Sequence, residues 1–444
     1  MKVWKLLWSF VPTYRSFARF TLAMGLGIIF AAVAGAKLGH FFAGLPAAFD
    51  SRQGNWFPDR FERSGILKYD PARAYSGYTL YTVAPDLSAH LIDMNGREIH
   101  KWFVPFDVAV PGSSRSITSL FGLAVRQIEG GYLYPNGDIL LVYEVRTVGR
   151  PGTPLVKLDK DSHVIWRSKV GAHHAIQVVG DKIYALTGER QRPQQDRRTQ
   201  TRNRRVPYSG EHVSILDSNG NTLSTHSIME AIANTDDIRL VEAVRSSARQ
   251  GGEQDLHSNS IDVLTDQTAR FIPGAKPGNV LLSLRSLDML VVMDLEAEKI
   301  VWALRGSWRK QHDAKMLPNG HILLFDNSGD LITEHGRSRV LEIDPRTGGI
   351  AWSYDGTNSD PLDSSENRGG AQRLSNGNTL INEANAGRIL EVTGDHKVVW
   401  EFVNPDQKVL RGSKYIASFG LNVTRYDPSY VKFLNLDKNH VAKQ

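Results

Sequence analysis

Residues 291–302 read VVMDLEAEKIVW, and this short stretch contains the pattern that decides the fold. An apolar run ends at Asp294, a polar turn follows, and a second apolar run closes on Trp302. Two such runs joined by a turn are typical of antiparallel β-strands. The chain carries six copies of this pattern. The other five are LIDMNGREIHKW (91–102), LVKLDKDSHVIW (155–166), VSILDSNGNTLS (213–224), VLEIDPRTGGIAW (340–352) and ILEVTGDHKVVW (389–400).

A second repeated element lies between these copies. In it, Asn-Gly or Gly-Asp joins two short alternating runs, which predicts a tight β-hairpin. Each period therefore holds about four strands, the content of one propeller blade. We predict an all-β chain with a six-bladed β-propeller over residues 75–435, in which only residues 227–249 show a helical pattern. The hairpin copies are YLYPNGDILLVY (132–143), IQVVGDKIYALTG (176–188), MLPNGHILLFDN (316–327) and RLSNGNTLINEA (373–384).

The two ends of the predicted propeller also have assigned roles. Residues 421–434, LNVTRYDPSYVKFL, are predicted to form a closing strand that pairs with the first blade and removes an exposed sheet edge. Residues 46–74 are predicted to be a stalk that wraps onto the propeller, and residues 436–444 a polar tail. The tryptophans that end five of the copies are predicted to pack between blades. They are Trp102, Trp166, Trp302, Trp352 and Trp400.

The N-terminus predicts a membrane anchor in residues 1–45. An uncharged run of 17 residues, Phe20–Ala36, follows four basic residues, and the first 49 residues contain no acidic one. A run of this length is at the short end of what spans a bilayer as a helix. Basic residues before the run place the N-terminus in the cytoplasm and the rest of the chain on the periplasmic or extracytoplasmic side. The alternative is an export signal cleaved near the small residues Ala31–Ala36.

Composition excludes several function classes. The chain has no cysteine, so disulfides, thiolate metal sites and cysteine nucleophiles are ruled out. The net charge of +6 lies largely in two local clusters, which does not support nucleic-acid binding. Nucleotide-binding and zincin motifs are absent from the sequence. The second basic cluster, residues 190–205, is interpreted as a solvated insertion, with a dock for an anionic glycan, lipid headgroup or sulfated substrate as the alternative.

Four histidines lie at matching places in the repeats. His173 and His174, His257 and His312 each come directly before the first strand of a hairpin, and Arg368 takes that place in the last repeat. The inner strands of a propeller surround a central funnel, so residues at equivalent repeat positions converge there. We therefore expect these side chains to form one site.

Three segments resemble, in chain order, the bacterial arylsulfotransferase family of six-bladed propellers. They are GAHHAIQ (171–177), DLHSNSID (255–262) followed by LLSLRS (281–286), and WRKQHDAKMLPNGHILLFDN (308–327). The resemblance implies that His312 accepts the sulfuryl group as a sulfohistidine and that His257 and Arg285 bind the sulfate. It leaves both His173 and His174 as matches for a further family histidine. Asn259 and Arg368 are added as candidates for substrate binding.

The implied function is a sulfotransferase that needs no nucleotide donor. It would move a sulfuryl group from an aryl sulfate to a phenol, with no cofactor and no metal, since Arg285 near the same centre would repel a cation. Cationic side chains suit three sulfuryl oxygens that carry negative charge during transfer. The alternative is a non-catalytic propeller that binds a glycan or a protein partner. Six copies argue against an eight-bladed quinone-dependent dehydrogenase.

Overall fold

The computed structural model describes residues 55–111, 125–146, 153–188, 210–249, 256–327, 337–362, 367–410 and 412–434. All of them belong to the compact unit Gly54–Gln444, which is mainly antiparallel β-structure. The predicted anchor and the basic cluster at 190–205 lie outside the described residues. Within the described ranges, no helix is both long enough and apolar enough to span a bilayer.

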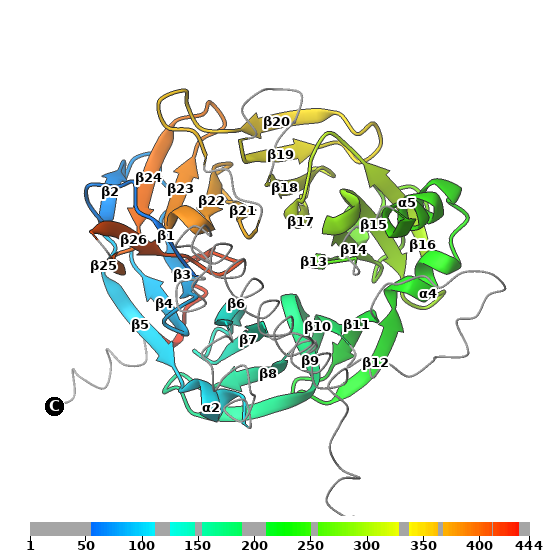
Figure 1. Cartoon of the computed structure of the whole chain (residues 1–444), viewed down its shortest axis with the longest axis horizontal. Helices are drawn as coiled ribbons and strands as arrows, with labels where there is room; N and C mark the ends of the chain where they lie inside the picture. The colour runs from blue at the N-terminus through cyan, green and yellow to red at the C-terminus, as the bar shows by residue number, and fades with distance from the viewer. Residues whose placement is uncertain are drawn as a thin grey trace, which may run out of the picture. The chain divides into compact units, whose positions relative to one another are not determined.

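The sheets follow one another in chain order around a common centre (Figure 1), so the fold is all-β and propeller-like. Two four-stranded sheets come from single stretches of chain. The first contains β13 (Ser258–Val263), β14 (Val280–Leu284), β15 (Met289–Asp294) and β16 (Lys299–Arg305), and the second contains β17 (His312–Met316), β18 (Ile322–Asp326), β19 (Arg339–Ile343) and β20 (Ile350–Tyr354). The predicted hairpins therefore form as expected, since residues 291–302 run from β15 into β16, and residues 316–327 run from the last residue of β17 through β18.

One sheet differs from the expected blade. It has seven strands because β9 runs without a break for 16 residues, first beside β8 and then beside β10. Ala172 is the residue where the two pairings meet, since it lies opposite both Thr153 and Thr187. The sheet contains β6 (Val125–Leu133), β7 (Ile139–Arg146), β8 (Thr153–Leu158), β9 (Val164–Val179), β10 (Lys182–Gly188), β11 (Glu211–Leu216) and β12 (Thr222–Ser227).

The two ends of the unit pair with each other. The C-terminal strand β27 lies against β3, with Thr424 opposite Leu80, which confirms the predicted pairing of the closing strand with the first blade. Their sheet contains β27 (Thr424–Tyr426), β3 (Tyr78–Val83), β4 (Ser88–Ile92) and β5 (Glu98–Phe103). Because β27 pairs with β3, the edge of β3 that faces β27 is not left unpaired.

Segments before the first sheet also join sheets formed late in the chain. β2 (Gly65–Tyr69) covers the outer edge of β24 and makes a five-stranded sheet, and β1 (Trp56–Pro58) pairs with β26. The five-stranded sheet contains β2, β24 (Val398–Val403), β23 (Arg388–Val392), β22 (Thr379–Glu383) and β21 (Gly370–Arg373), and the remaining sheet contains β1, β26 (Ser413–Ala417) and β25 (Gln407–Leu410).

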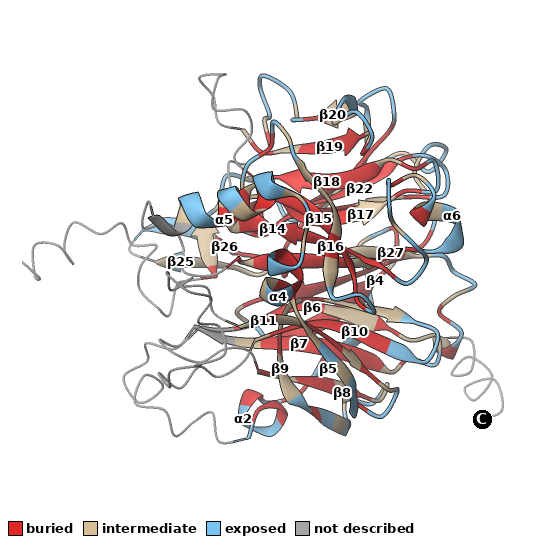
Figure 2. Cartoon of the chain, turned by 90° about the vertical axis from the view of Figure 1, so that its right-hand side faces the viewer, coloured by how far each residue is buried: buried red, intermediate tan, exposed pale blue. Residues whose placement is uncertain are grey.

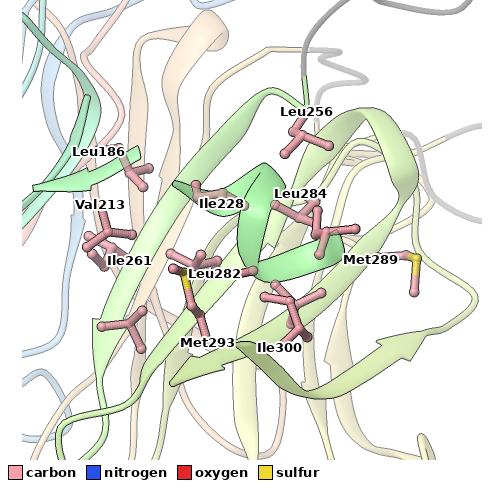
Figure 3. Close-up of a cluster of buried hydrophobic side chains, with 14 of the residues drawn as sticks. Leu186, Val213, Ile228, Leu256, Ile261, Leu282, Leu284, Met289, Met293 and Ile300 are labelled. Atoms are coloured by element: carbon pink, nitrogen blue, oxygen red, sulfur yellow. The ribbon is translucent and has the colours of Figure 1, made fainter. Parts of the chain in front are cut away.

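The hydrophobic core lies between neighbouring sheets, and the turns are exposed (Figure 2). The largest cluster packs Leu186 and Val213 against Ile261 and Leu282 of the next sheet (Figure 3). Ile228, in one of the few helices, is buried in the same cluster. The helices are α2 (Phe106–Ala109), α4 (Ile228–Ala233), α5 (Ile238–Arg249) and α6 (Asp266–Ala269), with the short 3-10 turns η3 (Arg285–Leu287) and η4 (Ala384–Ala386).

Side chains also hold the innermost strands side by side. The backbone N–H of Ala314 donates to the Ser260 hydroxyl at 3.1 Å, and that of Met316 donates to the Asp262 carboxylate at 2.8 Å. In the same way, the Asp313 carboxylate accepts the N–H of Ala371 at 3.0 Å. These bonds join β13 to β17 and β17 to β21, so the strand entries that carry the polar site residues are fixed relative to one another.

Several of the tryptophans join neighbouring sheets. Trp102 and Trp400 are fully buried, and the Trp400 indole N–H donates to the carbonyl of Met94 at 2.9 Å, across the boundary between the last and first sheets. The indole N–H of Trp352 likewise donates to the carbonyl of Gly394 in the following sheet, whereas that of Trp166 donates to the carbonyl of Ser218, in the turn between β11 and β12 of its own seven-stranded sheet. Packing between sheets is therefore confirmed for Trp352 and Trp400.

Replacing Trp400 by alanine is expected to lower the free energy of unfolding by about 3–5 kcal/mol, the usual cost of emptying a large buried site. Half-buried Trp302 offers a matched control, whose alanine variant should lose clearly less. Urea unfolding of both variants measures the difference. Equal losses in the two variants would mean that the burial of Trp400 between the last and first sheets contributes no more to the free energy of unfolding than the half-buried Trp302 does.

Candidate functional site

The polar site residues come from the entries of the inner strands. His312 is the first residue of β17, His257 directly precedes β13, and Arg285 follows β14. His173 and His174 lie inside the long strand β9 instead of before a strand. His174 and His257 have positive φ angles of 55° and 51°, a backbone conformation that non-glycine residues seldom adopt.

The ring of His312 is held in one tautomer. Its Nδ1 lies 3.0 Å from the carbonyl oxygen of Lys310 and 2.7 Å from Oδ1 of Asn327. The Asn327 amide is oriented by its own Nδ2, which donates to the carbonyl of Arg368. Because Nδ1 faces two acceptors, it carries the proton, and the lone pair of the neutral ring lies on Nε2.

Burial keeps this ring uncharged. His312 is 2% exposed, and burial lowers its pKa to about 3. The hydrogen bond to Asn327 opposes this shift, while electrostatic interactions with His257 and Arg285 add to it. Near neutral pH, His312 is therefore a neutral imidazole with a nucleophilic nitrogen, and His257 and Arg285 lie close enough to act on it.

Three histidine rings form a continuous chain. Nδ1 of His173 lies 2.9 Å from Nδ1 of His174, and Nε2 of His174 lies 3.2 Å from Nε2 of His257. A carboxylate oxygen of Glu129 lies 3.8 Å from His174 Nδ1, and Glu129 also accepts the backbone N–H of His174. The sequence left His173 and His174 open as matches, and the structure places His174 in direct contact with His257 and His173 one ring further away.

A buried carboxylate fixes the position of His257. Glu211 accepts the backbone N–H groups of His257 and Ser258 at 2.9 and 2.8 Å, and also the Ser258 hydroxyl. Sequence reasoning missed both Glu211 and Asn327. The available signal was a polar residue at the end of an apolar strand, since Glu211 begins β11 and Asn327 directly follows β18.

Arg285 joins the same region through its backbone and its side chain. Its N–H donates to the carbonyl of His257 at 3.2 Å, and its Nη2 donates to Oδ1 of Asn367 at 3.4 Å. The residue is 4% exposed, so its charge acts in an environment with little water. The Arg285 guanidinium can therefore donate two N–H hydrogen bonds to an anionic group bound near His312.

Asn259 and Arg368 contact the site in different ways. Asn259 donates through Nδ2 to the carbonyl of Gln311 at 2.8 Å, and within the described residues its buried Oδ1 has no hydrogen-bond partner. The Arg368 guanidinium lies in a buried network with Ser418 and Asn55, each at 2.6 Å, and with Gln127. Arg368 thus reaches His312 through its backbone carbonyl and Asn327.

No three His, Asp or Glu side chains in the described part of the chain are arranged to hold a metal ion. A separate surface cavity is lined by tyrosines and arginines, and none of the site histidines lines it. Its lining includes Tyr75, Arg373, Arg425, Tyr426 and Tyr430.

Replacing Asn327 by leucine is expected to lower kcat by at least about tenfold, because the group that orients a reactive imidazole sets its tautomer. In Asn327→Asp, a carboxylate beside Nδ1 favours the imidazolium, so the pKa of His312 should rise. The acid limb of the pH profile should therefore move to higher pH. The pH dependence of kcat measures both effects. Asn319→Leu, in the turn of the same hairpin, is the control, and an equal loss there would contradict the assignment.

Comparison with known proteins gives one match of long extent. A sequence model described as arylsulfotransferase (ASST) matches residues 135–405, more than half of the chain. No curated protein matches the sequence.

Solved structures show weaker likenesses. The chain is similar to a protein of unknown function from Bacteroides caccae, with 11% identity, 74% of this chain and 94% of that chain covered, and a TM-score of 0.45. It is also similar to the WD40 β-propeller domain of Doa1 (8% identity, 84% and 98% covered, TM-score 0.41). Streptogramin B lyase gives 11% identity, 84% and 97% covered, and a TM-score of 0.40. At these TM-scores the likenesses to the three structures are loose.

Proposed function

Because the chain belongs to the arylsulfotransferase family, we propose that it is a transferase that moves a sulfuryl group from an aryl sulfate to a phenol through a sulfohistidine on His312. No nucleotide donor takes part. The observation that carries the proposal is the state of the His312 ring, with its proton held on Nδ1 by Lys310 and Asn327 and its lone pair on Nε2.

In the first displacement, Nε2 of His312 attacks the sulfur of the donor. The N–S bond forms while the S–O bond to the phenol breaks, and the electron pair of that bond leaves with the phenolate oxygen. The proton on Nδ1 stays in place, where the two acceptors stabilise the positive charge that the ring gains. Burial, which keeps the free ring neutral, makes these two hydrogen bonds more valuable once the ring is modified.

In the second displacement, the oxygen of the acceptor phenol attacks the same sulfur. The S–N bond breaks and its electron pair returns to Nε2, which restores the neutral ring. Negative charge spreads over the sulfuryl oxygens in both steps, and donors from Arg285 and His257 would stabilise it where it develops. The open acceptor of Asn259 suits a hydroxyl or N–H donor in the bound complex.

The proposal extends to the complete chain. Residues 1–45 anchor it to a membrane, or direct its export, and the described sheets form a six-bladed propeller on the extracytoplasmic side. The uncharged run after basic residues and the four-strand repeats support this. Cell fractionation with protease treatment of intact spheroplasts tests it. Digestion of the propeller with the membrane intact is expected, and protection would overturn the placement.

A transfer assay with the full chain tests the activity. The donor is an aryl sulfate that releases a coloured phenol, and a second phenol is the acceptor. We expect parallel lines in double-reciprocal plots, no dependence on an added nucleotide sulfate, and a mass gain of one sulfuryl group when the acceptor is withheld. No turnover across several donors and acceptors would instead favour a propeller that only binds.

A further inference from the structure

Sulfuryl transfer between phenols requires a place to keep one proton. The leaving phenolate takes up a proton in the first displacement, and the acceptor phenol gives one up in the second. His312 cannot store it, because its Nδ1 proton stays in the hydrogen bonds to Lys310 and Asn327 while Nε2 holds the sulfuryl group. For a phenol with a high pKa, a group beside His312 is therefore needed that loses and regains the proton once in each cycle.

The three-ring chain of His173, His174 and His257 has the right connections for this task. Its two N···N contacts, at 2.9 and 3.2 Å, each need one bridging proton. Three neutral imidazoles carry three protons, so after the two bridges one proton remains for the two outer nitrogens, Nε2 of His173 and Nδ1 of His257. A fourth proton fills both outer positions and gives the chain a single positive charge.

The charges around the chain differ between its two ends. At the His257 end, the positively charged Arg285 lies close by and disfavours a further positive charge, while Glu211 accepts backbone N–H groups there. At the His173 end, burial lowers the pKa of the ring, although Glu211 and Glu144 oppose that shift. In the middle, Glu129 lies 3.8 Å from His174. A positive charge on the chain is therefore best supported at the central ring, beside Glu129.

We propose that His173, His174 and His257 form a proton relay for sulfuryl transfer, in which His257 exchanges the proton with the phenol oxygen and His173 is a positioning residue that extends the chain and keeps its charge near Glu129 between turnovers. This inference rests on the proposed function. In the first displacement, the singly charged chain gives the proton on His257 Nδ1 to the leaving phenolate and becomes neutral, and it stays neutral while His312 carries the sulfuryl group. In the second, the acceptor phenol gives its proton to His257, the bridging protons shift, and the positive charge of the chain is restored beside Glu129.

A relay and a purely structural contact predict different responses to the donor. A leaving phenol with a low pKa departs without a proton, whereas one with a high pKa needs proton transfer during departure. Losing the relay should therefore slow poor leaving groups selectively. A structural defect in β9 would slow all donors by the same factor.

The test compares His173→Gln with the wild-type chain over a series of aryl sulfates whose phenols span a wide pKa range. We expect kcat/KM for the poorest leaving groups to fall by at least about tenfold, in line with general acid catalysis, with little change for nitrophenyl donors. His212→Gln, in the strand next to β10, is the control and should leave the series unchanged. The slope of log kcat/KM against phenol pKa should become steeper only in the His173 variant.

The pH profile gives a second readout. In His173→Gln, the positive charge of the chain is confined to His174 and His257, nearer Arg285. The pKa that controls the basic limb of the pH profile should therefore fall, so the loss of activity with rising pH should begin at a lower pH. An equal loss for every donor, with an unchanged pH profile, would overturn the relay. A wild-type chain without any transfer would instead overturn the proposed function, so the two failures are distinguishable.

Discussion

Substituting His312 by alanine is expected to lower the transfer rate by at least about a thousandfold, since removing a nucleophile leaves only binding and charge stabilisation. No other described side chain combines its buried ring, its fixed Nδ1 proton and its proximity to His257 and Arg285. The loss should appear in kcat for every donor, because both displacements pass through Nε2. The expected mass gain on withholding the acceptor should vanish in the same variant.

The control for this variant is His321→Ala, which lies in the turn of the same hairpin and bonds to Glu342 instead of the site. It should keep most of the activity. Urea unfolding of His312→Ala separates a chemical loss from a folding defect. Retained burst release of the coloured phenol by a folded His312→Ala chain would rule out this residue as the acceptor.

The second large effect concerns Arg285. Arg285→Met should lower kcat/KM by about a hundredfold to a thousandfold, the usual cost of removing a donor that stabilises charge in the transition state. Arg285→Lys should recover part of the loss, because it keeps the charge but not the fork. Removing this positive neighbour should also raise the pKa of His312, so the acid limb of the pH profile should move to higher pH in Arg285→Met.

Exposed Arg305, which pairs loosely with Asp288 at 3.7 Å, offers a matched arginine. Arg305→Met should change kcat/KM by less than the error of the assay. Steady-state kinetics on both variants give the comparison. If Arg285→Met raised KM alone and left kcat intact, Arg285 would bind the sulfate equally in the ground and transition states, and its proposed role in the transition state would be wrong.

The sequence predicted the repeated hairpins and the closing strand because both depend on local patterns. Alternating apolar residues and Asn-Gly turns specify a strand pair wherever they occur, and a polar turn with apolar runs on both sides leaves few other structures. The expectation that His257 and His312 lie near each other came from their matching positions in the repeats.

Other features depend on contacts between distant residues and could not be read from patterns. Glu211 and Asn327 act through residues in other strands, so nothing beside them in the chain marks their partners. The continuous strand β9 was also missed, because Gly171, beside the boundary between its two pairings at Ala172, is a residue type that often interrupts a strand. Arg368 occupies the predicted repeat position, but its side chain follows a polar network with Asn55 and Ser418 that no repeat encodes.

The pairing of β27 with β3 also implies an order of folding during synthesis. Residues 424–426 are synthesised long after residues 78–83, so the sheet that contains β3 cannot be completed until more than 300 further residues have been added. Contacts between such distant segments are slow to form, because a very long loop must close first. A chain cut short anywhere before Thr424 lacks this strand and keeps an open template for aggregation on β3. Only a chain that extends through Tyr426 can therefore complete the sheet that contains β3.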